Sequence, residues 1–212
     1  MKWRSRVTPV VQLDRVEKAR MIERVLEDFL GSTLEGFRIL DVGCGNGDIS
    51  NHLGKRNVQY GVDVSDRRRV QNRQFEFRLV ESEILPFDSS CFDIVVSHHV
   101  IEHVNDHSRH LTEIHRVLRP DGCAYLATPN RSSPLMKGHV GNNQVLRYRQ
   151  MEPLFARCGF EAHRYTDRML NEAARFGLAF RFGRLVPAPI IAALSTWIPS
   201  HTFMLRPLAL EQ

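Results

Sequence analysis

Three alternating glycines, Gly43, Gly45 and Gly47, follow directly on a short run of strand-forming residues at 37–42. A helix-like stretch at 49–55 comes next, so the local order is strand, turn, helix. Glycine permits a tight turn at the end of the strand, and its missing Cβ lets a nucleoside lie against the backbone. The sequence therefore predicts an α/β sheet with a nucleoside site at the end of its first strand.

The alternation of strands and helices continues along the chain. Further strands are expected at 58–64, 75–80, 92–97, 123–128 and 160–165, with a last edge strand at 202–205. Helices are expected from a cap at Asn105 or Asp106 to Leu118, and at 150–158. Strands that alternate with helices over 30–128 indicate a parallel sheet with helices on both faces.

The length predicts one domain over residues 1–212, because a chain of this size buries one sizeable core and not two full α/β domains. Apolar residues at three- and four-residue spacing predict an N-terminal helix at 14–30. The cofactor-binding core is placed at 37–165. Segment 168–200 mixes Leu, Phe and Ala with arginines, and is interpreted as a helical insertion before the last strand, either a lid over the acceptor site or an ordinary cover for the sheet edge.

Composition excludes several classes of protein. The four cysteines lie far apart with no CxxC pair, which indicates neither a disulfide framework nor a thiolate zinc site. The basic N-terminus lacks the apolar core of a signal peptide, and the longest apolar stretch, 185–198, is shorter than the roughly 20 residues of a spanning helix. A cytoplasmic protein is expected, with peripheral membrane contact left open. Basic and acidic residues are interspersed, so the net charge of +5 does not favour nucleic acid as a partner.

The glycine spacing distinguishes between nucleotide classes. Dinucleotide-binding turns follow the pattern GxGxxG, whereas this chain has GxGxG with Asp48 at the sixth position. Asp41 precedes the turn, where a carboxylate suits a cationic amino group and repels a pyrophosphate. Asp63 ends the second expected strand, where a carboxylate can accept hydrogen bonds from ribose hydroxyls. The pattern argues against NAD.

Five segments together resemble class I S-adenosylmethionine-dependent methyltransferases of the type 11-like group, over residues 37–165. They are 39–49 (ILDVGCGNGDI), 62–65 (VDVS), 81–87 (ESEILPF), 92–96 (FDIVV) and 113–122 (EIHRVLRPDG). The resemblance implies a Rossmann-like fold with a seven-stranded, mostly parallel sheet of order 3-2-1-4-5-7-6, whose last strand is antiparallel. It also implies S-adenosyl-L-methionine as cofactor and S-adenosyl-L-homocysteine as product.

The resemblance implies roles for individual residues. Glu81 would accept the exocyclic amine of adenine, with the Ser82 amide facing a ring nitrogen and Glu83 as the alternative acceptor. The full set of expected cofactor-binding residues is Asp41, Gly43, Cys44, Gly45, Asp63, Val64, Glu81, Ser82 and His98.

Six of the ten histidines fall between His98 and His115. In the methyltransferase family that the sequence resembles, the end of the fourth strand faces the transferable methyl group. The resemblance therefore implies His99, Glu102 and His103 as the candidate catalytic residues. His103 is favoured as a general base, which the reaction needs only for a weak nucleophile such as a hydroxyl. The residues at 99–103 also resemble the E-x-x-E-H metal motif of ubiquinone-pathway and small-RNA methyltransferases; a divalent metal, with His139 as a further ligand, is the less favoured alternative.

The predicted activity is methyl transfer to a small-molecule or lipid-like acceptor, with an oxygen atom favoured. The alternatives are a non-catalytic scaffold that binds S-adenosylmethionine, an RNA methyltransferase and an NAD-type oxidoreductase. Both a monomer and a homodimer fit the sequence.

Overall fold

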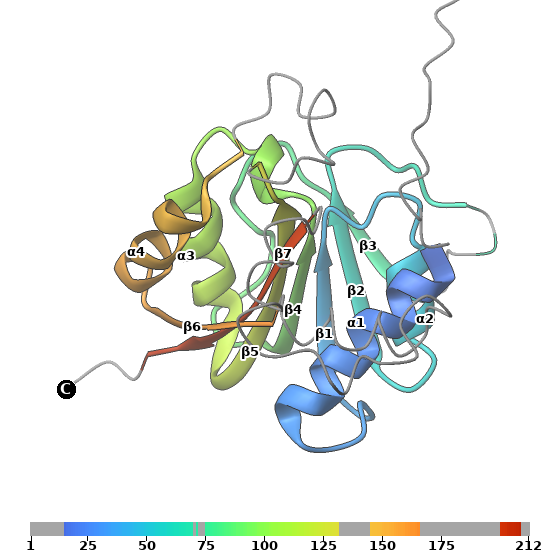
Figure 1. Ribbon diagram of the computed structural model, residues 1–212. Coiled ribbons are helices and arrows are strands. Elements are labelled where there is room, and N and C mark those ends of the chain that lie inside the picture. Colours follow the sequence, from blue (N-terminus) through green and yellow to red (C-terminus); the bar gives the residue numbers. More distant parts are fainter. Residues whose placement is uncertain (1–14, 70, 72–74, 132–144, 166–199, 209–212) are drawn as a thin grey trace, which may run out of the picture.

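Seven strands form a single sheet in the order β3-β2-β1-β4-β5-β7-β6, as predicted. The computed structural model describes residues 15–69, 71, 75–131, 145–165 and 200–208 (Figure 1). β7 pairs antiparallel with both neighbours, and the other adjacent strands pair in parallel. The strands are β1 (Arg38–Val42), β2 (Val58–Asp63), β3 (Glu76–Leu79), β4 (Phe92–His98), β5 (Leu118–Pro129), β6 (Phe160–Arg164) and β7 (Ser200–Pro207).

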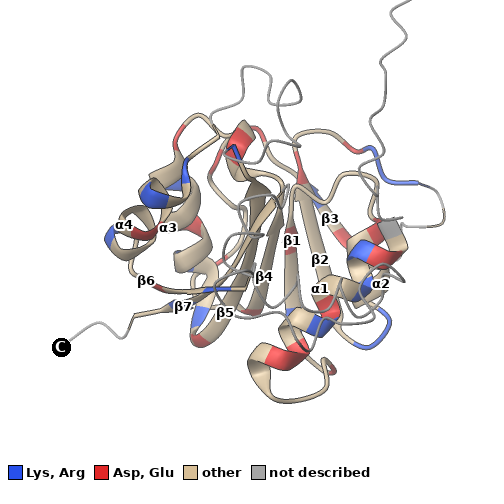
Figure 2. Cartoon of the chain, in the orientation of Figure 1, with Lys and Arg blue, Asp and Glu red and all other residues tan. Residues whose placement is uncertain are grey.

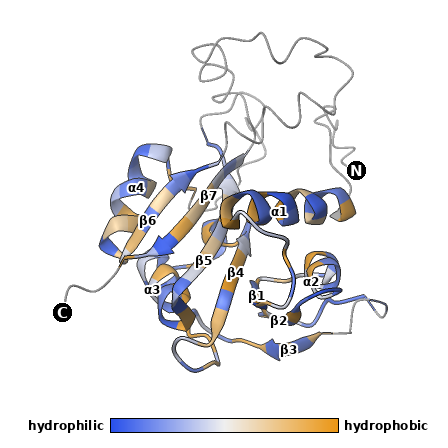
Figure 3. Cartoon of the chain, turned by 90° about the horizontal axis from the view of Figure 1, so that it is seen from below, coloured by the Kyte–Doolittle hydropathy of each residue, from blue (hydrophilic) through white to orange (hydrophobic). Residues whose placement is uncertain are grey.

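Helices cover both faces of the sheet (Figures 1 and 3). One face carries α1 (Arg15–Leu30) and α2 (Asp48–Leu53). The other carries α3 (His107–Val117) and α4 (Tyr148–Arg157). A short 3-10 helix, η2 (Ile101–His103), connects β4 to α3, and Asp106 caps α3 by accepting a hydrogen bond from the Arg109 amide. This is the covering of both faces that alternating elements predict.

Two hydrophobic cores result, one on each face, because successive side chains of a strand point to opposite sides. On β1, Ile39 packs with α1 and α2, while Leu40 and Val42 pack with α3 and α4. On β4, Ile94 joins the first core and Val95 the second. The same alternation directs the polar side chains at the ends of β1 and β4.

Two strand predictions need correction. Residues 202–205 were expected at the edge of the sheet, but β7 lies between β5 and β6 and is buried for most of its length. The strand expected at 123–128 already begins at Leu118. A register shift opposite Phe92 and Ile94 accommodates the extra residues.

The loop at 85–87 is held in place by α3. Arg116 donates hydrogen bonds to the carbonyls of Phe87 and Leu85, and the Leu85 amide donates to the Glu113 carboxylate. Arg116 and Glu113 also form an ion pair at 2.8 Å. Two of the segments that resemble the methyltransferase family, 81–87 and 113–122, therefore contact each other through hydrogen bonds.

Charges of both signs are mixed along the helices, as Figure 2 shows for α1. None of the described helices has the length and apolar content that crossing a membrane requires. The four cysteines are free thiols. The proposed lid at 168–200 falls, apart from Ser200, outside the described residues.

Leu40 and Leu79 offer a matched test of this packing. Leu40 is fully buried on the interior strand β1, and Leu79 is exposed on the edge strand β3. We expect Leu40→Ala to lower the free energy of unfolding by about 2–5 kcal/mol because it leaves a cavity. Leu79→Ala should change it by about 0.5 kcal/mol or less. Urea denaturation of both variants measures the difference, and equal losses would contradict the described sheet order.

Candidate functional site

The glycine turn lies at the carboxyl end of β1 and has the backbone conformation that glycine favours. Gly43, Gly45 and Gly47 have φ angles of 71°, 56° and 80°. The amides of Gly43 and Cys44 donate to the Val62 carbonyl at 2.8 and 3.0 Å, which ties the turn to β2. A Cβ at Gly43 would lie 2.5 Å from Val100, whereas one at Gly45 would have the Gly43 carbonyl oxygen, 4.0 Å away, as its nearest neighbour. The turn therefore leaves room beside Gly45.

Asp63, at the end of β2, organises this turn. Its Oδ2 accepts a hydrogen bond from the Gly45 amide at 2.8 Å, while Oδ1 accepts from the Ser65 amide and from Arg67, both at 3.3 Å. A carboxylate has about four acceptor positions, so capacity remains for a further donor. The side chain of Arg67 is 66% exposed and free to move aside. Val64, next in the chain, is 71% exposed, so the site presents an apolar surface beside a carboxylate.

Asp41 takes a position inside the protein. It is 1% exposed, and its Oδ2 accepts a hydrogen bond from Ser50 Oγ at 2.6 Å. Burial raises the pKa of Asp41 to about 7, with the nearby Asp63 carboxylate adding to the effect and the Ser50 hydrogen bond opposing it. Asp41 thus joins the end of β1 to α2 and titrates near neutral pH.

This shift has a consequence for stability. Between pH 4 and 7 folded Asp41 keeps a proton that the unfolded chain releases, so its contribution to the free energy of unfolding falls as pH rises through that window. We expect the wild-type value minus that of Asp41→Asn to fall by on the order of 3 kcal/mol from pH 4 to 7 and to stay level above it. Urea denaturation across this range measures the difference, and a constant difference would contradict the burial of Asp41.

The loop after β3 is positioned by the same carboxyl edge, since the Val80 amide donates to the Asp63 carbonyl at 3.0 Å. Glu81 and Ser82 follow and are exposed. Glu83 instead accepts a hydrogen bond from the Asn105 amide at 3.2 Å, and backbone hydrogen bonds lower its pKa. Glu83 therefore connects two loops, which leaves Glu81 as the more accessible carboxylate near Asp63.

His98 ends β4 on the α1 face. Its ring stacks on Tyr125 with centroids 6.1 Å apart and meets the His99 ring edge-on at 4.6 Å. Both ring nitrogens are buried, and neither has a hydrogen-bond partner among the described residues. Burial lowers the pKa of His98 to about 3, so the imidazole is neutral and has one N–H to donate. Since a buried donor without a partner is costly, His98 has unused capacity for a ligand.

His99 and Glu102 form a pair directly after β4. His99 Nδ1 lies 3.1 Å from Glu102 Oε1, and His99 Nε2 lies 3.1 Å from the Oγ of Ser200 on β7. Glu102 is 3% exposed and also accepts a hydrogen bond from Thr128 Oγ1 at 3.4 Å. His99 has a φ of 59°, which few non-glycine residues adopt.

His103 lies apart from this pair. It is exposed at the end of η2, and its backbone amide donates to the Val100 carbonyl. Among the described residues, no three His, Cys, Asp or Glu side chains form a group able to hold a metal. His139, the further ligand of the metal alternative, is outside the described residues. His110, another histidine of the cluster between His98 and His115, is buried on α3 with its Nε2 3.2 Å from Ser97 Oγ.

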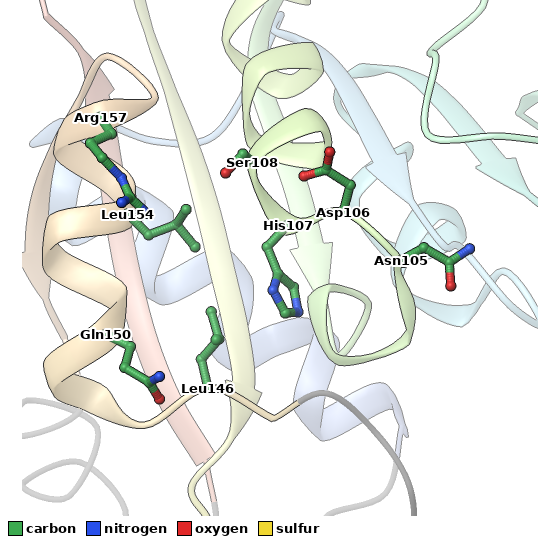
Figure 4. A pocket seen from close by; sticks show the side chains of 8 residues that line it. All are labelled: Asn105, Asp106, His107, Ser108, Leu146, Gln150, Leu154 and Arg157. Atoms are coloured by element: carbon green, nitrogen blue, oxygen red, sulfur yellow. The ribbon is translucent and has the colours of Figure 1, made fainter.

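A groove of about 400 Å³ lies between the start of α3 and α4 (Figure 4). His107 lies on the α3 side, while Gln150 and Arg157 come from α4, and most of the lining is polar. The groove begins within three residues of η2. The groove therefore offers a polar rather than a lipid-like surface at the start of α3.

Comparison with known proteins agrees with this geometry. Residues 40–126, which contain the glycine turn, Asp63 and the His99–Glu102 pair, match the family model described as a methyltransferase domain. Residues 40–126 thus match the methyltransferase domain family, and the strand order is the one that the resemblance to class I S-adenosylmethionine-dependent methyltransferases implies. The methyltransferase domain resembles a phosphoethanolamine N-methyltransferase of Haemonchus contortus in complex with S-adenosyl-L-methionine at a TM-score of 0.63 and 20% identity, covering 91% of this chain and 52% of that one.

Curated relatives share part of the sequence. A ubiquinone biosynthesis O-methyltransferase of Rhizobium rhizogenes is 34% identical over 108 residues, which are 47% of this chain and 44% of the relative. A mitochondrial arginine hydroxylase of Mus musculus is 38% identical over 89 residues, which are 39% of this chain and 26% of the relative. The chain thus spans less than half the length of these relatives, and their names describe different reactions.

The structure brings the sequence-predicted residues together in two groups, one at the glycine turn and one at the end of β4. Asp63 and the glycines lie together, and His99 lies with Glu102. Ser200 and Thr128 were not predicted, because they are 101 and 26 residues from their partners in the chain. The pairing of β5 with β7 brings them to the pair, and no local sequence signal marks them.

Proposed function

We propose that this chain transfers a methyl group from S-adenosylmethionine to a small-molecule acceptor, and that the acceptor atom is an oxygen. The observation that carries the proposal is the glycine turn with Asp63. An open, Cβ-free surface at Gly45 lies beside a carboxylate that has acceptor capacity left. Nucleoside sites in α/β folds combine these two features at the end of the first strand.

The residues present fit this cofactor. Asp63 would accept from the ribose hydroxyls, with Val64 against the adenine and Glu81 and Ser82 at its polar edge. The buried N–H of His98 has no partner in the described part of the chain and can donate to the methionyl carboxylate. Asp41 adds negative potential beneath Gly43 and Cys44 when it ionises. The cofactor supplies an electrophilic methyl group on a sulfonium sulfur, and the protein's contribution is to position the acceptor and exclude water.

Support for an oxygen acceptor is twofold. The His99–Glu102 pair supplies a base, which a hydroxyl needs and a neutral amine does not. The similarity to an O-methyltransferase of ubiquinone biosynthesis points the same way. A lipid-like acceptor, an RNA acceptor and a scaffold without turnover are the alternatives, and a cytoplasmic location belongs to the proposal.

Gly45 and Gly36 give a matched test of cofactor binding. Both have positive φ angles, 56° and 79°, and a Cβ at either position would make no close contact. Alanine at either should cost about 1–2 kcal/mol of stability through backbone strain. We expect Gly45→Ala to weaken S-adenosylhomocysteine binding at least about tenfold, because its Cβ fills the cofactor's position. Gly36→Ala should bind like wild type; calorimetry showing equal affinity in the two variants would count against the site.

An acceptor assay tests the function itself. The protein is incubated with methyl-labelled S-adenosylmethionine and, separately, catechols, primary amines, a lipid extract and transfer RNA. We expect label in the catechols and little in the other classes, because the paired base suits a hydroxyl. Label in RNA or in lipid would contradict a small-molecule acceptor and would identify that class as the acceptor instead. Cofactor binding without label in any acceptor would favour the scaffold alternative.

A further inference from the structure

Four side chains from distant parts of the chain form one hydrogen-bonded row at the carboxyl end of β4. The row runs from Ser200 on β7 to His99, then to Glu102 on η2 and to Thr128 on β5, with separations of 3.1, 3.1 and 3.4 Å. It joins three neighbouring strands of the sheet at a single edge. The proposed function uses the His99–Glu102 pair of this row as a base. It does not say which atom of the pair receives the proton of the acceptor's hydroxyl group.

The hydrogen bonds determine the tautomer of His99. A carboxylate can only accept, and Glu102 receives Thr128 Oγ1 on Oε2, so its Oε1 accepts from His99 Nδ1. In the neutral imidazole His99 Nε2 therefore carries a lone pair, and the Ser200 hydroxyl donates to it. The imidazole is oriented as a base whose lone pair points toward Ser200 on β7.

His99 is held rigidly in this orientation. Its backbone amide donates to the Ala127 carbonyl at 2.9 Å, and its φ of 59° is a strained value for a histidine. Glu102, which orients the ring, is almost completely buried. His99 itself keeps a side-chain exposure of 32%, so a molecule can reach its ring. Rigid support with an accessible ring is the arrangement that a preorganised base requires.

We propose that His99, oriented by Glu102, is the general base of the reaction, and that Ser200 Oγ marks the position that the acceptor's hydroxyl oxygen takes. This inference rests on the proposed function and deepens it. The acceptor's O–H proton passes to His99 Nε2, and the oxygen forms the new C–O bond to the methyl carbon as the C–S bond breaks. The electron pair of that bond goes to sulfur, and the imidazolium is stabilised by Glu102. Glu102 acts as a positioning residue.

The geometry favours His99 over His103 as the base, and it favours a hydroxyl group over an amine as the acceptor. His103 is exposed, whereas Glu102 orients the ring of His99, so the geometry favours His99 over the residue that the sequence favoured. Ser200 shows that a hydroxyl fits against Nε2 at 3.1 Å, within the reach of a general base. A neutral amine acceptor would be nucleophilic without this base, so the row would serve no purpose for it.

Nitrogen NMR of the cofactor-free protein tests the base directly. With His99→Asn to assign the signals, since asparagine tolerates a positive φ, we expect wild-type His99 to show a protonated Nδ1 and an unprotonated Nε2. Glu102→Gln should release this preference, giving a mixture of tautomers. A protonated Nε2 in the wild type, or an unchanged tautomer in Glu102→Gln, would overturn the proposal.

The acidity of the acceptor supplies the second readout. Catechol keeps its protons at neutral pH, whereas 4-nitrocatechol is already largely ionised and needs no base. We expect His99→Asn to slow transfer to catechol by about 10²–10⁴-fold and transfer to 4-nitrocatechol far less. Equal slowing of both, or a selective loss in His103→Asn instead, would overturn the assignment. If EDTA stops turnover of the wild-type protein and added Mg²⁺ restores it, the row binds a metal ion and the proposed base is overturned.

Failure of this inference can be distinguished from failure of the proposed function. Calorimetry with S-adenosylhomocysteine reports the cofactor site without the base, and the NMR experiment reports the base without the cofactor. If the protein binds the cofactor and methylates amines but none of the hydroxyl probes, the proposed methyl transfer stands. The assignment of His99 as general base is then overturned. Absent cofactor binding would overturn the function, whatever the tautomer of His99.

Discussion

The pairing of β1 with β4 is the constraint on which the site depends. The chain leaves β1 toward β2 and β3 on one side, and continues from β4 toward β5 on the other, so the strand order reverses between β1 and β4. Connections that depart in opposite directions open a crevice at the carboxyl ends of these strands. The glycine turn ends β1 and His98 ends β4, so a single backbone pairing sets the cofactor residues beside the proposed base.

Around this crevice the protein keeps polar groups and backbone strain that its two hydrophobic cores must offset. Asp41 is buried with its pKa raised, His98 has buried nitrogens without partners among the residues that the structure describes, and His99 adopts a positive φ. Each of these costs folding free energy. Such costs concentrate where ligands bind, because a site must be organised before its ligand arrives. Their occurrence together at one edge of the sheet supports a functional role for that edge.

Much of this arrangement could be predicted from the sequence, because its determinants are local. A glycine turn between strand-forming residues and a helix predicts β1, α2 and the cofactor edge, and Asp63 follows at a fixed distance in the chain. The base could not be predicted in the same way. His99, Glu102 and His103 look equivalent in sequence, and the choice between them depends on the φ of His99, which turns its ring toward β7. Ser200 enters through strand pairing that no short pattern encodes.

The central claim is that the cofactor occupies the crevice between β1 and β4, and amide NMR of the labelled protein during titration with S-adenosylhomocysteine tests it most directly. The account predicts large shifts at Gly43, Gly45 and Val64 and at His98 on β4, with little change along α4 and β6. Shifts confined to the groove between α3 and α4, or no shifts at saturating ligand, would contradict it.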